Sequence, residues 1–162
     1  MTIEPVVIKL RNRLNSISTQ SKNNFLKKFS VIHARWHHAE MMDGIGTFNG
    51  SPIGFLSFHH EVIRVYMSKF NQNLTAGTMA KPSPPYRKLI DSISDPLEFS
   101  HALEGWHGLV HMNPKYGPNF GNPTKNIYMP RFWNFHKFIE SKLLTWLEKN
   151  NIDYNDIDHS MI

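Results

Sequence analysis

Apolar residues recur at helical spacing along most of this chain, and polar stretches rich in Gly, Pro and Asn separate the periodic segments. Residues three and four apart lie on one face of a helix, so this spacing predicts a mainly α-helical fold. The expected helices cover residues 6–15, 22–42, about 51–70, about 95–111 and about 130–147. The four longer ones predict an antiparallel four-helix bundle with long connecting loops.

Local signals indicate where three of these helices begin. Ser51-Pro52 offers a capping serine followed by a proline in the first turn. The stretch from Asp95 to Glu98 resembles a capping box with proline in the first turn, and Pro130 opens the last helix. Loops are expected over residues 71–85 and 113–129. A loop as long as the second one is usually functional in a compact domain.

Length and composition predict a single domain over residues 1–162, with a core at about 10–148 and a loosely packed tail over 150–162. The absence of cysteine excludes disulfides, thiolate catalysis and cysteine-based metal sites. The formal charge of +5 is spread over every segment, so we expect no nucleic-acid partner. No apolar run could span a bilayer and no secretory signal is visible, which predicts a cytoplasmic protein without membrane contact.

Six of the 10 histidines fall into two matching sets, each a pair spaced i, i+4 plus one later histidine. The first set is His33, His37 and His59, and the second is His107, His111 and His136. Because residues i and i+4 share a helix face, each pair can direct two imidazoles at one point. A third histidine from a neighbouring helix would complete a three-nitrogen site. Two such sites facing each other predict a dinuclear metal centre inside the bundle.

Helical geometry separates the expected ligands from their neighbours. His37 shares a stripe with His33, whereas His38 is rotated by about 100° from His37. His37 is therefore the expected ligand, and His38 is its alternative. His59 lies in an apolar stripe, whereas His60 lies on another side of the same helix. His60 and His101 are expected at the surface or in contact with a metal-binding histidine. His159 is expected in solvent.

The ligand type narrows the choice of metal. Imidazole nitrogen suits copper, zinc, iron and nickel, and six imidazoles without an obligatory carboxylate favour copper or zinc. A carboxylate-bridged di-iron centre is an alternative, which requires Glu-x-x-His motifs on two different helices. The two motifs of that spacing are Glu98-x-x-His101 and Glu104-x-x-His107. Both fall on one predicted helix, which disfavours the di-iron centre.

Three stretches around these histidines resemble the copper-binding motifs of tyrosinases. LEGWHGLVH, residues 103–111, resembles the second copper motif, where a Leu-Glu-Gly stretch leads into His-x-x-x-His. MPRFWNFHKFIE, residues 129–140, resembles the later Asp-Pro-x-Phe-Trp-x-His-His segment, and FLSFHHEVIRVY, residues 55–66, resembles the Phe-Leu-Pro-Trp-His segment of the first site. The order and spacing agree over about residues 10–148. The chain is thus similar to a short, divergent member of the tyrosinase, catechol oxidase and hemocyanin superfamily.

The resemblance implies a type 3 dicopper centre, with two copper ions as cofactors and with dioxygen and a small phenolic or aminophenolic substrate as partners. By motif, one copper would be bound by His107, His111 and His136, and the other by His59 together with His33 and His37. Glu104 matches the glutamate that holds an active-site water in that family. The implied function is oxidation of o-diphenols or o-aminophenols to quinone-type products, with weak hydroxylation of monophenols.

Some positions depart from the family pattern. The usual middle histidine of the first site would fall near Gly50, so an i, i+4 pair of the kind that arthropod hemocyanins use would replace it. Phe135 replaces the first histidine of a His-His pair, and Gly108 stands where an asparagine is common. Two alternatives to the oxidase remain, namely a non-catalytic protein that binds dioxygen or copper on the same scaffold, and a helical enzyme or binding module that uses zinc.

Overall fold

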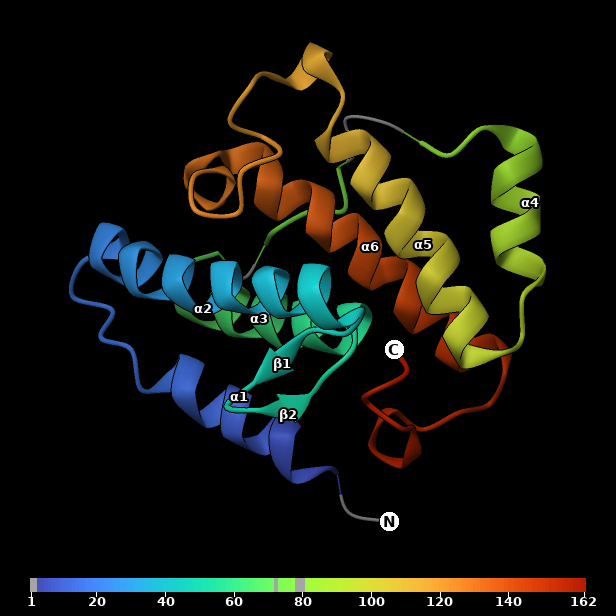
Figure 1. Cartoon of the computed structure of the whole chain (residues 1–162), viewed down its shortest axis with the longest axis horizontal. Helices are drawn as coiled ribbons and strands as arrows, with labels where there is room; N and C mark the ends of the chain where they lie inside the picture. Colours follow the sequence, from blue (N-terminus) through green and yellow to red (C-terminus); the bar gives the residue numbers. More distant parts are fainter. Residues whose placement is uncertain (1–2, 72, 78–80) are drawn as a thin grey trace.

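The computed structural model describes residues 3–71, 73–77 and 81–162, and in these ranges the chain is mainly helical, as predicted (Figure 1). The α-helices of this part of the chain are α1 (Pro5–Asn15), α2 (Lys22–Asp43), α3 (Phe55–Lys69), α4 (Pro84–Ser92), α5 (Pro96–His111) and α6 (Pro130–Lys149). Short 3-10 turns follow at η1 (Pro114–Tyr116), η2 (Asn126–Tyr128) and η3 (Tyr154–Asp156). None of the helices described has the length and apolar character that crossing a bilayer requires.

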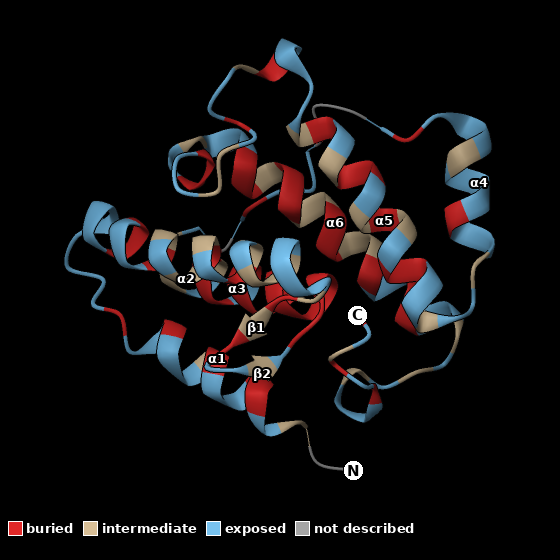
Figure 2. Ribbon diagram, in the orientation of Figure 1, coloured by how far each residue is buried: buried red, intermediate tan, exposed pale blue. Residues whose placement is uncertain are grey.

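Helix α3 is the central element of the fold. From Phe55 to Tyr66 every residue except Arg64 is buried, and α1, α5 and α6 all contact this helix. Figure 2 shows buried positions along α3 and on the faces of the surrounding helices that turn inward. A helix buried on all sides must satisfy its polar side chains within the protein. The histidines and the glutamate of α3 therefore lie where specific partners are required.

Aromatic contacts give the relative direction of the long helices. In the pairs α2–α3 and α5–α6, residues later on the first helix contact residues earlier on the second, so each pair is antiparallel. The ring centroids are separated by 5.0 Å for Phe25–Phe70 and 6.4 Å for Trp36–Phe55, and by 4.9 Å for Phe99–Trp146 and 5.7 Å for Trp106–Phe138. These large side chains hold the helices apart and leave space between them for the imidazoles.

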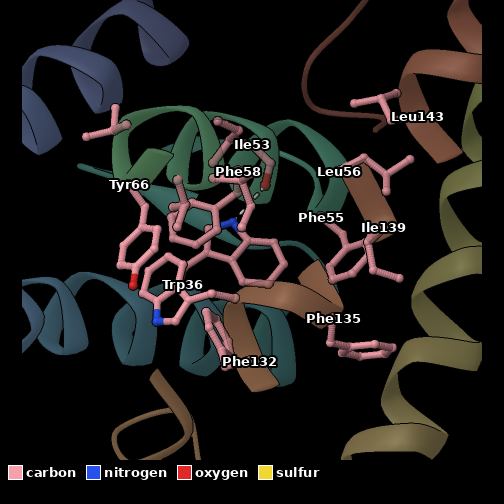
Figure 3. Close-up of a cluster of buried hydrophobic side chains, with 14 of the residues drawn as sticks. Trp36, Ile53, Phe55, Leu56, Phe58, Tyr66, Phe132, Phe135, Ile139 and Leu143 are labelled. Carbon is pink, nitrogen blue, oxygen red and sulfur yellow. Dashed lines mark hydrogen bonds between the residues drawn. The ribbon is translucent and has the colours of Figure 1, made fainter. Parts of the chain in front are cut away.

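Buried aromatic and aliphatic side chains fill the space between the helices (Figure 3). Trp36 stacks on Phe58 with ring centroids 4.9 Å apart, and its indole nitrogen donates to the Ile53 carbonyl oxygen at 2.9 Å. Gly46 allows this position, since a Cβ there would lie 2.0 Å from the Trp36 ring. Six aromatic residues of the three histidine motifs are buried in this core: Phe55, Phe58, Trp106, Phe132, Trp133 and Phe135.

The predicted helix start at Ser51-Pro52 is wrong. Ser51–Pro52 forms strand β2 and pairs antiparallel with strand β1, Thr47–Phe48. The connecting residues Asn49 and Gly50 both have positive φ, 50° and 76°, which is the geometry of a two-residue hairpin turn. The hairpin delays the start of α3 to Phe55.

The loop predicted over residues 71–85 extends too far along the chain, because α4 already begins at Pro84. Pro84 and Pro85 form the first turn of α4, where proline is favoured because its missing N–H is not needed there. The hydroxyl of Tyr86 donates to the Ala102 carbonyl oxygen at 2.9 Å and attaches α4 to α5. Residues 72 and 78–80 of the predicted loop lie outside the described residues.

The tail after residue 150 is packed, contrary to the prediction of a loose end. His159 and Ile162 are fully buried. The Gly54 N–H donates to the His159 carbonyl oxygen at 2.6 Å, and the Ser57 N–H donates to the Ile162 carbonyl oxygen at 2.5 Å. A Cβ on Gly54 would lie 2.1 Å from the Ile162 backbone, so this close approach requires glycine. The tail thus covers the first turn of α3.

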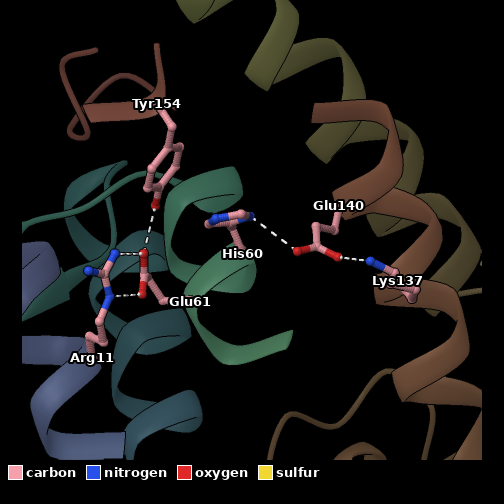
Figure 4. Close-up of polar contacts among 6 residues, drawn as sticks. All are labelled: Arg11, His60, Glu61, Lys137, Glu140 and Tyr154. Carbon is pink, nitrogen blue, oxygen red and sulfur yellow. Dashed lines mark hydrogen bonds and ion pairs between the residues drawn. The ribbon is translucent and has the colours of Figure 1, made fainter. Parts of the chain in front are cut away.

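His60 was expected at the surface or in contact with a metal-binding histidine. It is instead buried in a polar network between α3 and α6 (Figure 4). Its Nδ1 lies 3.2 Å from the Glu140 carboxylate, which also pairs with Lys137. Burial opposes ionisation of Glu140, but the contacts with His60 and Lys137 outweigh it and lower the pKa of this carboxyl group.

The neighbouring residue Glu61 belongs to the same side of α3. The Arg11 guanidinium donates two hydrogen bonds of 2.9 Å to its carboxylate, and the Tyr154 hydroxyl donates a third at 3.1 Å. Glu61 is 1% exposed, so this full pairing is what makes its burial possible. Figure 4 shows Arg11, Glu61 and Tyr154 converging from three segments of the chain.

Candidate metal centre

The structure brings both predicted histidine sets together as two triads. The first triad joins His33 and His37 of α2 with His59 of α3, and the second joins His107 and His111 of α5 with His136 of α6. In each triad the three candidate ligand nitrogens lie within 4.8 Å of one another. Two buried clusters that could each hold a metal ion are therefore present. The ligand role of each residue remains a prediction.

Two of the imidazoles are oriented by their own helices. His59 Nδ1 lies 2.8 Å from the Phe55 carbonyl oxygen, and His136 Nδ1 lies 2.7 Å from the Phe132 carbonyl oxygen, each four residues earlier. A carbonyl oxygen only accepts hydrogen bonds, so Nδ1 carries the proton in both rings. Nε2 is then left with a free lone pair, which is the state in which a histidine binds a metal.

The loop over residues 113–129 orients one histidine of each triad. The carbonyl oxygen of Pro123 accepts from His33 Nδ1 at 2.8 Å, and that of Phe120 accepts from His111 Nδ1 at 2.6 Å. By the same argument, both rings present Nε2 as an acceptor. This loop therefore supplies a backbone acceptor to each triad.

The ring nitrogens of each triad converge on one another. His33 Nε2 lies 3.1 Å from His37 Nε2, and His107 Nε2 lies 2.9 Å from His136 Nε2. His59 Nε2 is buried and has no hydrogen-bond partner among the described residues. A buried polar atom without a partner is costly, and a metal ion at the point of convergence would satisfy these lone pairs together. The donor set thus fits a metal.

Burial keeps the imidazoles neutral. The pKa of four imidazoles lies well below the usual value, mainly because burial removes their hydration: His33, His59, His107 and His136. Neighbouring imidazoles lower these pKa values further. Burial also lowers the pKa of His111 to about 4. Neutral imidazole is the form that binds metals, so these five imidazoles are ready for metal at neutral pH.

The two triads adjoin each other. The rings of His59 and His136, from different triads, are stacked with centroids 4.9 Å apart, and His59 and His107 are 6.0 Å apart. Phe135 lies parallel to His107 at 5.6 Å, and Phe120 stacks on His111 at 4.3 Å. These aromatic rings pack against the imidazoles of His107 and His111 and reduce their access to water.

A cleft of about 480 Å³ gives access to the triads from solvent. Its lining includes His37 of the first triad and both α5 histidines of the second, so a ligand in the cleft can reach both. Met41, four residues after His37 on α2, is 83% exposed and lies at the cleft margin.

Glu104 also lines this cleft, next to Glu40 of α2. Burial raises the pKa of Glu104, and the charge of Glu40 and a hydrogen bond to Glu40 raise it further, to about 8. Glu40 lies 3.5 Å from His37 Nδ1 through its Oε2 atom. Sequence analysis did not identify Glu40, although its position three residues after His37 on a helix was a usable signal.

The other predicted candidates lie outside the triads. His38 and His101 are exposed, and His101 lines the cleft. His159, expected in solvent, is buried, with its Nδ1 2.7 Å from the Ser57 hydroxyl. Neither triad contains a carboxylate, and Glu61 and Glu140 are paired elsewhere, so the geometry gives the di-iron alternative no support.

No family model, curated protein or solved structure matches this chain. The membership of the dicopper superfamily that the motifs suggest is therefore an inference from those motifs alone.

The first triad yields a prediction about neighbouring histidines. His37→Ala is expected to lose one bound metal ion per chain, because this imidazole converges with that of His33. His38→Ala is expected to retain it, because His38 points into solvent on the same helix. Metal analysis after dialysis checks both variants, which are matched in size and charge. Loss of the ion in His38→Ala alone would reverse the assignment.

Proposed function

We propose that this protein is a copper-dependent oxidase that uses dioxygen to convert o-diphenols or o-aminophenols into quinone-type products. In this proposal α2, α3, α5 and α6 act as a four-helix bundle around a dinuclear centre. One observation carries it: two triads of converging imidazoles lie side by side, and His59 of one stacks on His136 of the other with ring centroids 4.9 Å apart. Two ions held in this way would be close enough to act on one molecule.

The donor set supports copper. Nitrogen-only sites suit copper and zinc, and copper binds more tightly than other divalent metals of its series. Copper ions in the two triads would supply the transfer of electrons between substrate and dioxygen. The protein residues orient the imidazoles through the carbonyl oxygens of Phe55, Pro123 and others, and the aromatic walls exclude water. The motifs shared with tyrosinases favour copper over zinc.

The cleft suits a small aromatic substrate. An o-diphenol loses two electrons and two protons to become a quinone, and dioxygen takes up four of each to become two waters, so two diphenols are consumed per dioxygen. The Glu104 carboxyl group lies on the access route and has a pKa of about 8, which is close to neutral pH. It is our candidate for the group that accepts or returns the substrate proton.

The proposal is tested with copper-loaded protein, 4-methylcatechol and an oxygen electrode. We expect quinone formation and the consumption of one dioxygen per two diphenols, and no activity in the metal-free or zinc-loaded protein. If the copper-loaded protein binds two ions but does not turn over any diphenol, the non-catalytic alternative is correct. Activity with zinc and without dioxygen would identify a different enzyme.

Gly108 leads to a prediction about the type of reaction. A phenol has a pKa near 10 and must lose its proton before it can bind a metal, so a well-placed base matters most for monophenols. The asparagine common at this position in tyrosinases, which helps to hold a water, is absent here. We therefore expect strong oxidation of diphenols and slow or absent hydroxylation of monophenols.

Gly108→Asn should raise the monophenol rate more than the diphenol rate. A side chain has room there, because a Cβ at Gly108 would meet no atom within 4 Å. Steady-state rates with tyramine and 4-methylcatechol measure the change. Gly105→Ala serves as a control, since a Cβ at Gly105 also meets no atom within 4 Å. Comparable rates on both substrates in the wild type would show that Gly108 does not limit the reaction.

A further inference from the structure

The charge of the cleft is opposite to that of the whole chain. The chain carries a formal charge of +5 and its sequence pI is about 9.5. The cleft nevertheless contains two acids, Glu40 and Glu104, and none of the described residues that line it is Lys or Arg. Its local field therefore favours positively charged ligands and opposes carboxylates.

The cleft also contains a hydrogen-bond acceptor that lacks a partner. Asn126, at the start of η2, is 4% exposed and lines the cleft. Its Nδ2 donates to the Phe120 carbonyl oxygen at 3.1 Å, which fixes the orientation of the amide group. Its Oδ1 is buried and has no hydrogen-bond partner among the described residues. A ligand with an N–H or O–H donor would satisfy it.

The same Phe120 carbonyl oxygen accepts the hydrogen bond from His111 Nδ1. The amide of Asn126 is thus anchored to the backbone group that orients a histidine of the second triad. A ligand that binds Oδ1 would be placed next to the dinuclear site rather than at the distant end of the cleft. The acceptor is independent of the two glutamates and suits a ligand that carries an N–H or O–H donor.

We propose that the cleft selects phenolic substrates that carry an amino group over those that carry a carboxylate, with the negative charge of the hydrogen-bonded pair Glu40 and Glu104 attracting the ammonium and Asn126 Oδ1 accepting a hydrogen bond from the substrate. The proposal rests on the proposed oxidase function and names its substrate class. Met41 and Met112, both exposed at the cleft margin, provide apolar contact for the linker between ring and amine.

The test compares kcat/KM for three catechols at pH 7: 4-(2-aminoethyl)catechol, 4-methylcatechol and 3-(3,4-dihydroxyphenyl)propionate. We expect the amine to be preferred over the neutral compound, and the carboxylate to be the poorest substrate. In Glu40→Gln the ratio of amine to neutral should fall by about fivefold, the effect expected for loss of one partly exposed ion pair. Glu148→Gln, an equal change of charge on the exposed side of α6, should leave this ratio unchanged.

Asn126→Leu should also lower the amine preference, and circular dichroism shows whether this variant folds. If it does not fold, the wild-type order and the Glu40→Gln ratio decide the question. Equal kcat/KM for the amine and the carboxylate would overturn the proposal. If no catechol is oxidised, the oxidase function fails. Calorimetric titration of the metal-free protein with the same amine and carboxylate then still decides selectivity, since the cleft exists without metal. Equal affinities would overturn the proposal in that case.

Discussion

The variant His136→Ala is expected to bind about one copper ion per chain where the wild type binds about two, and to lose its oxidase activity. His136 is 1% exposed and its Nε2 lies 2.9 Å from His107 Nε2, so its removal leaves the second triad with two imidazoles. Oxidation of a diphenol by one dinuclear unit requires both ions, and the remaining ion cannot replace the missing one. His107→Ala should have the same effect.

Copper content after dialysis and oxygen uptake with 4-methylcatechol measure this result. His101→Ala is the matched control for copper content, since His101 is an exposed histidine of α5 and belongs to neither triad. Circular dichroism is needed as well, because removal of a buried ring leaves a cavity that weakens packing. A folded His136→Ala protein that keeps both copper ions would refute the assignment of the second site.

The metal-free protein is expected to lose stability steeply as the pH falls from about 6.5 towards 4. The triad histidines with lowered pKa are neutral in the folded protein, whereas in the unfolded chain they take up protons below the ordinary pKa of 6.5. The unfolded state then binds more protons than the folded state, so stability falls with pH. Stability continues to fall until the pH is below the lowered pKa values of these histidines, which for His111 is about 4.

Glu104 has the opposite effect on the pH dependence of stability. The pKa of Glu104 is raised to about 8, so between its ordinary 4.5 and 8 the folded state keeps a proton that the unfolded state releases. The five histidines outweigh this single carboxyl group below pH 6.5. Urea unfolding at pH 7.5, 6.0 and 5.0 measures the dependence, with His101→Ala as a control for the loss of an exposed histidine. Equal unfolding free energies at the three pH values would contradict the burial of neutral imidazoles.

Local patterns were sufficient to predict the long helices and the two histidine sets. The i, i+4 pairs lie on one face whenever a helix forms, and His59 and His136 lie in apolar stripes that face the core. The N-cap at Asp95 is confirmed, since its side chain accepts from the Glu98 N–H at 2.9 Å. These features depend on contacts within about one helical turn.

Two local signals were misread. Ser51-Pro52 predicts a helix start, but Asn49-Gly50 is a hairpin signal, and the structure forms the hairpin. Pro84-Pro85 was read as the end of a loop, although proline is also common in the first turn of a helix. In both cases the same residue types fit two structures, and packing against the rest of the chain decided between them.

Long-range contacts could not be predicted. The burial of His159 depends on α3, which lies about a hundred residues earlier in the chain. The carbonyl oxygens of Phe120 and Pro123 orient His111 and His33 only because the loop folds back over the site. Likewise, nothing in the sequence pattern indicates that the side-chain oxygen of Asn126 is buried without a hydrogen-bond partner. The sequence thus indicated the candidate ligands, whereas their orientation required the structure.

Copper analysis combined with an optical spectrum under oxygen tests the central claim most directly. The copper-loaded protein is reduced under argon, exposed to dioxygen and then given a diphenol. We predict about two copper ions per chain, the number of histidine triads, with an absorption band that appears with dioxygen and disappears when the diphenol is added. A single bound ion, or two ions whose spectrum does not change with dioxygen, would contradict a dinuclear copper oxidase.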